Sequence, residues 1–83
     1  MIQVVIIDDE ENSRDSLKGK LDLFCPEVEI AAEAGNVKDG IAAITNSKPD
    51  AVFLDIKLAG ESGFDILDEV AKNSEVQPKI IFI

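Results

Sequence analysis

The chain alternates between short continuous apolar runs and longer segments whose apolar residues recur at helical spacing. The short runs are four to seven residues long, and three of them are almost entirely apolar, which is typical of strands buried in a sheet. The first of these is also rich in β-branched residues. The predicted strands are Ile2–Ile7, Val28–Ala34, Ala51–Leu54 and Lys79–Ile83. The second run alternates, with Val28, Ile30 and Ala32 predicted on one face and polar or small residues on the other. We therefore expect it at an edge of the sheet.

Between the predicted strands lie three segments with helical periodicity. The first should end near Phe24, because Pro26 cannot continue a helix. The second should run from Val37 to Asn46, with Asn36 as its N-cap. The third should run from Phe64 to about Asn73. The expected inward-facing residues are Leu17, Leu21 and Phe24 in the first helix, Val37, Ile41 and Ile44 in the second, and Phe64, Leu67, Val70 and Ala71 in the third.

The resulting order, β-α-β-α-β-α-β, predicts an α/β fold: a parallel sheet with helices on both faces and right-handed crossovers. The segment 56–63 is predicted to be a loop whose flexible points are Gly60 and Gly63, and 74–78 is a second loop. The chain has 83 residues, which is one domain at most and implies a marginal core.

The amino-acid composition limits the classes of function that the chain can have. Acidic residues outnumber basic ones 17 to 8, so the net charge of −9 disfavours nucleic acid as a partner and favours cations or a basic surface. No apolar run approaches the ~20 residues that span a membrane, and the N-terminus does not resemble a signal peptide. The lone Cys25 cannot form an intrachain disulfide and is expected to be a packing residue. We expect a cytoplasmic protein.

Carboxylates follow two of the predicted strands. Asp8 and Asp9 come directly after the first strand, and Asp55 follows the third. If the second and third strands lie on opposite sides of the first, these ends meet at a topological switch point, where α/β sheets bind ligands. Neighbouring strands are ~4.8 Å apart, so the carboxylates would repel one another. A hard cation such as Mg²⁺ would relieve that repulsion.

This arrangement indicates phosphoryl transfer to a carboxylate. Asp55, with no other acid beside it on a more buried strand, is the better nucleophile, and Asp8 and Asp9 are better metal ligands. The alternative is purely structural: Asp55 would cap the turn after its strand, and the acidic pair would be a solvated helix start.

Two segments together resemble the receiver domain of two-component response regulators. Residues 4–10 (VVIIDDE) are similar to its first strand and acidic pair, and residues 49–63 (PDAVFLDIKLAGESG) are similar to its phosphoacceptor strand and loop. Arg14 and Leu17 also fit the first helix of that family. The sequences of residues 55–58 (DIKL) and 63–66 (GFDI) resemble those of regulators with a LytTR-type DNA-binding output.

The resemblance implies a flavodoxin-like fold with strand order 2-1-3-4-5. It implies phosphorylation of Asp55 by a sensor histidine kinase. It implies Mg²⁺ held by Asp9, by Asp55, by Asp8 largely through water, and by the backbone carbonyl of Lys57. The chain would then be a signalling phosphoacceptor rather than an enzyme with turnover.

The sequence departs from the family pattern in two ways. Ala59 stands where proline is common, so the loop should be looser. The chain also stops at Ile83, so residues 1–83 are expected to be the N-terminal portion of a receiver, with order 2-1-3-4 and without the fifth strand and last two helices. Family residues that contact the phosphoryl group, a Thr or Ser and a Lys, would be absent. We expect self-association through the exposed fourth-strand edge.

Two other functions fit parts of the sequence. One is a pseudo-receiver that never carries phosphate and acts as an interaction or dimerisation module. The other is a Mg²⁺-dependent phosphatase of the haloacid-dehalogenase type. That family has a second Asp two residues after its nucleophile, whereas here Lys57 follows Asp55 and Glu10 follows Asp8 at that spacing.

Overall fold

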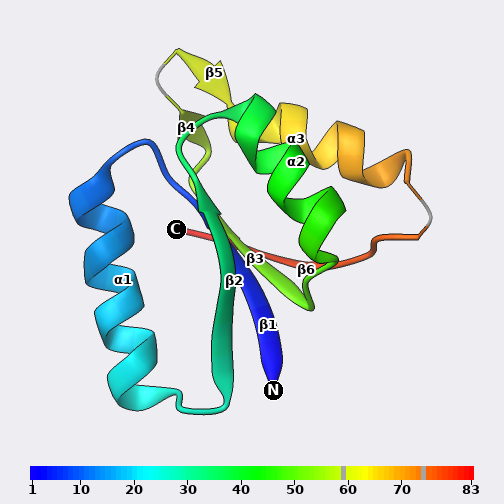
Figure 1. Cartoon of the computed structure of the whole chain (residues 1–83). Helices are drawn as coiled ribbons and strands as arrows, with labels where there is room; N and C mark the ends of the chain where they lie inside the picture. The colour runs from blue at the N-terminus through cyan, green and yellow to red at the C-terminus, as the bar shows by residue number, and fades with distance from the viewer. Residues whose placement is uncertain (59, 74) are drawn as a thin grey trace.

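The computed structural model describes residues 1–58, 60–73 and 75–83. A parallel four-stranded sheet runs through it in the order β2-β1-β3-β6, with α1 on one face and α2 and α3 on the other (Figure 1). The elements are β1 (Ile2–Ile7), α1 (Glu11–Phe24), β2 (Val28–Ala34), α2 (Val37–Ser47), β3 (Ala51–Leu54), β4 (Lys57–Leu58), β5 (Glu61–Ser62), α3 (Gly63–Ala71) and β6 (Lys79–Phe82). The α/β, flavodoxin-like fold and the order of its strands are therefore confirmed.

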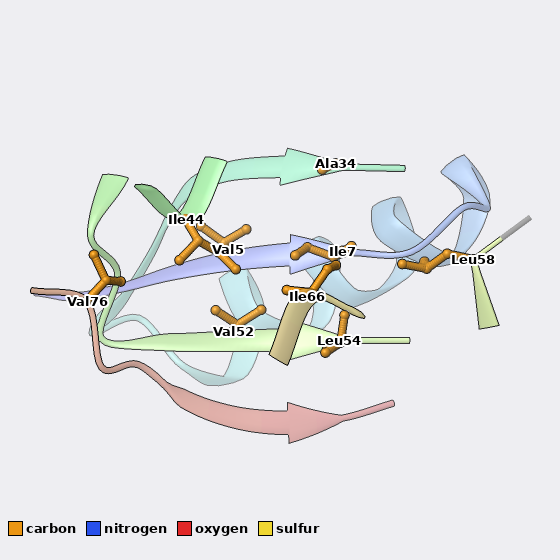
Figure 2. Packing of buried hydrophobic residues seen from close by; sticks show 9 residues of the cluster. All are labelled: Val5, Ile7, Ala34, Ile44, Val52, Leu54, Leu58, Ile66 and Val76. Carbon is orange, nitrogen blue, oxygen red and sulfur yellow. The ribbon is translucent and has the colours of Figure 1, made fainter. Parts of the chain in front are cut away.

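The larger part of the core lies between the sheet and the helices α2 and α3. Alternate residues of β1 and β3 point to this face, and Ile44 of α2 and Ile66 of α3 pack onto them (Figure 2). Leu58 lies past the carboxyl ends of the strands and is fully buried in the same cluster. Among the described residues, the buried members of this cluster are Val5, Ile7, Ala34, Ile44, Val52, Leu54, Leu58, Ile66 and Val76.

The opposite face of the sheet is covered by α1 through a smaller cluster of Val4, Ile6 and Leu21. Phe24 was expected to complete the inward stripe of this helix, and that expectation is wrong, because the side chain is 73% exposed. The neighbouring Cys25, four residues after Leu21, packs against the cluster instead. Residues four apart lie on the same face of a helix, so Cys25 is on the side of Leu21. The thiol is therefore a packing residue, as predicted.

Strand β2 lies at an edge of the sheet, as its wet face predicted. Its register with β1 shifts once, because Val4 pairs with Ile30 whereas Val5 pairs with Ala32. Ala31 is thus an extra residue, and it reverses the faces of the residues after it. Ile30 packs on the α1 side and Ala32 on the α2 side, so the expectation that they share a face is wrong.

The start of α3 differs from the prediction. The helix begins at Gly63, and its inward residues are Ile66, Leu67 and Val70. Phe64 is 52% exposed and Ala71 is exposed, so their expected inward positions are wrong. Gly63 is buried, and Ile66, Leu67 and Val70 lie three, four and seven residues after it, on the same helix face. The expectation for Ala59 lies outside the described residues.

The loop predicted for 56–63 contains a small antiparallel hairpin of β4 and β5. Gly60 has a φ of 86° in its turn, a conformation that glycine adopts readily. Gly63 was expected to be a flexible point but is the buried first residue of α3. None of the helices in the described part of the chain has the length and apolar character needed to cross a bilayer.

Candidate functional site

The register of the sheet brings the acidic strand ends together. Ile7 of β1 lies opposite Leu54 of β3, so the next residues, Asp8 and Asp55, leave the sheet side by side. The amide of Asp55 donates to the carbonyl of Ile7 at 2.9 Å, and the amide of Asp8 donates to the carbonyl of Ala34 at 3.0 Å. Both residues are therefore fixed by the last hydrogen bonds of the sheet.

Asp8, Asp9 and Asp55 each offer a carboxylate oxygen, and these three oxygens lie within 4.8 Å of one another. Asp8 is 7% exposed, Asp55 is half-buried and Asp9 is exposed. The geometry confirms that the acids predicted from two distant segments form one cluster at the switch point. Oxygen donors at this spacing and with this charge fit a hard divalent cation.

The pKa of Asp8 is raised above its usual value. Burial is the largest cause, and the negative charges of Asp55, Asp9 and Glu10 act in the same direction. The amide of Glu10 donates to Asp8 Oδ1 at 3.0 Å and opposes this shift by stabilising the ionised form. The site thus holds negative charge at a cost, which a bound cation would reduce.

The loop after Asp55 is fastened at several points. The amide of Lys57 donates to Asp55 Oδ1 at 3.1 Å, which orients the carboxylate. Leu58 is fully buried, and the amide of Gly63 donates to the carbonyl of Ile56 at 2.6 Å. At the far end of the hairpin, Glu61 Oε1 accepts from the amide of Val37, at the start of α2, at 3.2 Å. The amide of Lys57, which the sequence did not single out, is thus a contact of the site.

The sequence pattern also gave no role in the site to Arg14. Its Nη1 donates to the backbone carbonyl of Asp8 at 2.6 Å, and its Nε donates to Glu33 Oε1 at 3.0 Å. An arginine one turn into the helix that follows an acidic strand end is a signal in the sequence. Its target is a backbone atom, however, so no pairing of residue types reveals it.

Comparison with known proteins agrees with the fold and the acidic cluster. A family model described as "Response regulator receiver domain" matches residues 4–83, and the chain belongs to this family. "Sensory transduction protein LytT" of Bacillus cereus is 42% identical over 82 residues, which cover 99% of this chain and 32% of that protein. "Transcriptional regulatory protein BtsR" of Escherichia coli is 35% identical over 86 residues, which cover 100% of this chain and 34% of that protein. The chain therefore spans about a third of the length of these curated relatives.

Solved structures agree on the fold. The response regulator domain of Thermotoga maritima CheB superimposes with a TM-score of 0.87 at 23% identity, covering 99% of this chain and 59% of that chain. The response regulator PhyR from Brucella abortus superimposes with a TM-score of 0.84 at 26% identity, and the match covers 98% of this chain and 32% of that chain. Receiver membership argues against the phosphatase alternative, whose motif the residues after Asp55 and Asp8 also lack.

Proposed function

We propose that the chain is a phospho-accepting receiver that works in the cytoplasm and takes a phosphoryl group from a sensor histidine kinase onto Asp55. The observation that carries the proposal is the cluster of three carboxylates at the adjoining ends of β1 and β3. Within that cluster Asp55 is half-buried, and its Oδ1 accepts from the amide of Lys57. A carboxylate held in this way presents an oriented nucleophile.

In the proposed reaction an oxygen of Asp55 attacks phosphorus. An O–P bond forms as the N–P bond of a phosphohistidine breaks, and its electron pair leaves with the imidazole nitrogen. Asp8, Asp9 and Asp55 would hold Mg²⁺, together with the backbone carbonyl of Lys57, and the cation would supply the charge neutralisation that phosphoryl transfer needs. The chain itself positions the nucleophile, through the sheet bond at the Asp55 amide and the Lys57 amide at its carboxylate.

The relatives suggest where such a receiver would act. One is named a sensory transduction protein and another a transcriptional regulatory protein, and both are about three times longer than this chain. We infer that the chain serves as the receiver of a regulator of that kind. Its net charge of −9 leaves DNA contact to other parts of such a protein.

The direct test is intact-mass analysis after incubation with acetyl phosphate and Mg²⁺. We expect a single adduct with the mass of one added HPO₃ group, formed only with Mg²⁺ and lost in Asp55→Asn. The matched control is Asp50→Asn, at the opposite end of the same strand, where Asp50 Oδ2 accepts from the amide of Gln3 at 2.8 Å. This control should be phosphorylated like the wild type.

Other outcomes would select other functions. An adduct that survives in Asp55→Asn would place the nucleophile elsewhere. No adduct in the folded wild type, with Mg²⁺ present, would favour the pseudo-receiver. Mg²⁺-dependent release of inorganic phosphate from a phosphate monoester over many turnovers would favour a phosphatase.

A further inference from the structure

Arg14 reaches from α1 to the turn that carries the acidic pair. Its side chain is 17% exposed, and its guanidinium binds two groups from different strands. Nη1 donates to the carbonyl of Asp8, just past β1, and Nε donates to Glu33 Oε1 on β2. A planar guanidinium can hold two acceptors in a fixed relation, which a flexible ammonium does not do.

The carbonyl of Asp8 lies where the chain leaves the sheet. It lies one residue beyond the last paired residue of β1, on a residue that is 7% exposed. The amide of the same residue bonds to Ala34 and its Oδ1 accepts from the amide of Glu10. Asp8 is therefore fixed at three of its polar atoms, and Arg14 supplies the contact at the point where the chain turns away from the sheet.

Glu33 holds the guanidinium in place. Its two carboxylate oxygens bind Arg14 Nε at 3.0 Å and Lys18 Nζ at 2.6 Å. The hydrogen bond from Lys18 and then that from Arg14 lower the pKa of Glu33, so it stays ionised at neutral pH. Gly35 leaves the space that the guanidinium needs, because a Cβ there would lie 3.3 Å from Arg14 Nη1.

We propose that Arg14 is a positioning residue that holds the acidic turn 8–10 in the geometry that binds the cation. The inference rests on the proposed function, because the cation is the Mg²⁺ of that site. Arg14 acts through the backbone carbonyl of Asp8 and ties the turn to the edge strand β2 through Glu33. Contacts that orient metal ligands from behind contribute strongly to metal affinity.

The direction of the change in Mg²⁺ affinity when Arg14 is replaced distinguishes a positioning role from an effect of its charge. A cationic side chain near the site repels Mg²⁺, so loss of its charge alone would tighten binding. Loss of a positioning contact would weaken binding instead. Lys18 provides a matched control. Like Arg14 it pairs with Glu33, but its other ion pair is with Asp15 of α1 and not with the backbone of Asp8.

The experiment is a Mg²⁺ titration of the chain followed by the NMR amide shifts of residues 8–10 and 55–57. We expect Arg14→Met to weaken binding by on the order of tenfold. Arg14→Lys should bind as weakly as Arg14→Met, since an ammonium keeps the charge without the two-pronged geometry. Lys18→Met should bind as tightly as the wild type or slightly tighter. Unchanged or tighter binding in Arg14→Met, or an equal loss in Lys18→Met, would overturn the proposal.

A metal-free measurement keeps this proposal separate from the proposed function. Without Mg²⁺, hydrogen exchange of the Asp9 and Glu10 amides should be faster in Arg14→Met and unchanged in Lys18→Met. Unchanged exchange in a folded Arg14→Met would refute the positioning role even if the wild type binds Mg²⁺. A wild type that does not bind Mg²⁺ would instead refute the cation site, and with it the inference.

Discussion

At the scale of single residues, the ionised carboxylate of Asp8 opposes folding in the absence of a cation. Asp8 is nearly buried, and burial and three neighbouring acids raise its pKa. Since the folded state holds this proton more tightly than the unfolded chain, protonation of Asp8 stabilises the fold as pH falls. The contribution of Asp8 to stability is therefore poorest above the raised folded pKa and improves between that pKa and the unfolded value below it.

Because the ionised form of Asp8 is unfavourable in the folded state, we expect Asp8→Asn to stabilise the metal-free chain. An asparagine oxygen can still accept from the amide of Glu10, but it carries no charge to desolvate. We expect the thermal midpoint at pH 7 to rise by about 2–4 °C, as a gain of about 0.5 kcal/mol gives in a domain of this size. The gain should shrink as pH falls and wild-type Asp8 takes up a proton.

Differential scanning calorimetry from pH 4 to 7 measures the effect, with Asp22→Asn on the exposed face of α1 as the control. Adding Mg²⁺ should raise the midpoint of the wild type more than that of Asp8→Asn. A lower midpoint for metal-free Asp8→Asn at pH 7 would show that repulsion is not the dominant effect.

At the scale of elements, the join between β3 and α3 depends on close backbone contact. The hairpin of β4 and β5 returns the chain so that Gly63 lies directly against Asp55. A Cβ on Gly63 would be 2.6 Å from the carbonyl oxygen of Asp55 and 3.1 Å from the Cα of Ile56. Both are backbone atoms, so a side chain at residue 63 would displace the strand end that carries Asp55.

Gly63→Ala should therefore lower the free energy of unfolding by about 1–3 kcal/mol, the range for overpacked sites. Gly19→Ala is the matched control, because Gly19 lies inside α1 and a Cβ added there would meet nothing within 4 Å. It should raise stability by about 0.5–1 kcal/mol, the usual gain for alanine over glycine in a helix.

Urea unfolding followed by circular dichroism compares the two variants with the wild type. Wild-type or higher stability in Gly63→Ala would contradict the close approach. Destabilisation by Gly19→Ala would mean that glycine substitutions act through something other than local space.

At the scale of the whole molecule, β6 is the less protected edge of the sheet. It pairs with β3 on one side, and three apolar residues at its end are close to half exposed: Ile81 at 43%, Phe82 at 47% and Ile83 at 48%. Phe64 extends this patch, with its ring centroid 6.1 Å from that of Phe82. Apolar edge strands pair readily with another chain.

A polypeptide of these 83 residues should therefore self-associate through β6. Light scattering coupled to size exclusion should show an average mass that rises with concentration, and Ile81→Lys should shift it toward the monomer. Leu23→Lys is the control, because Leu23 is 73% exposed on α1 and does not belong to β6. A monodisperse wild-type monomer with a cooperative thermal transition would contradict this prediction.

The sequence by itself determined the strands of the parallel sheet, the helices between them and the position of the acidic cluster. Runs of apolar residues, interrupted only by Gln3 near the start of β1, defined β1 and β3 to the residue, since strands in the middle of a parallel sheet are covered on both faces. Acids placed directly after those runs predicted the cluster of Asp8, Asp9 and Asp55, because the carboxyl ends of parallel strands share one edge of the sheet.

Only the tertiary structure decided which face each residue lies on, how much space surrounds it and which backbone atoms it contacts. Periodicity gives a helix stripe to within about one residue, so the choice of Cys25 over Phe24 depended on the sheet beneath α1. The extra residue Ala31 exists only relative to the partner strand. The contacts of Gly63 and Arg14 go to the backbone of Asp55 and Asp8, which every residue type possesses and which no sequence pattern can single out.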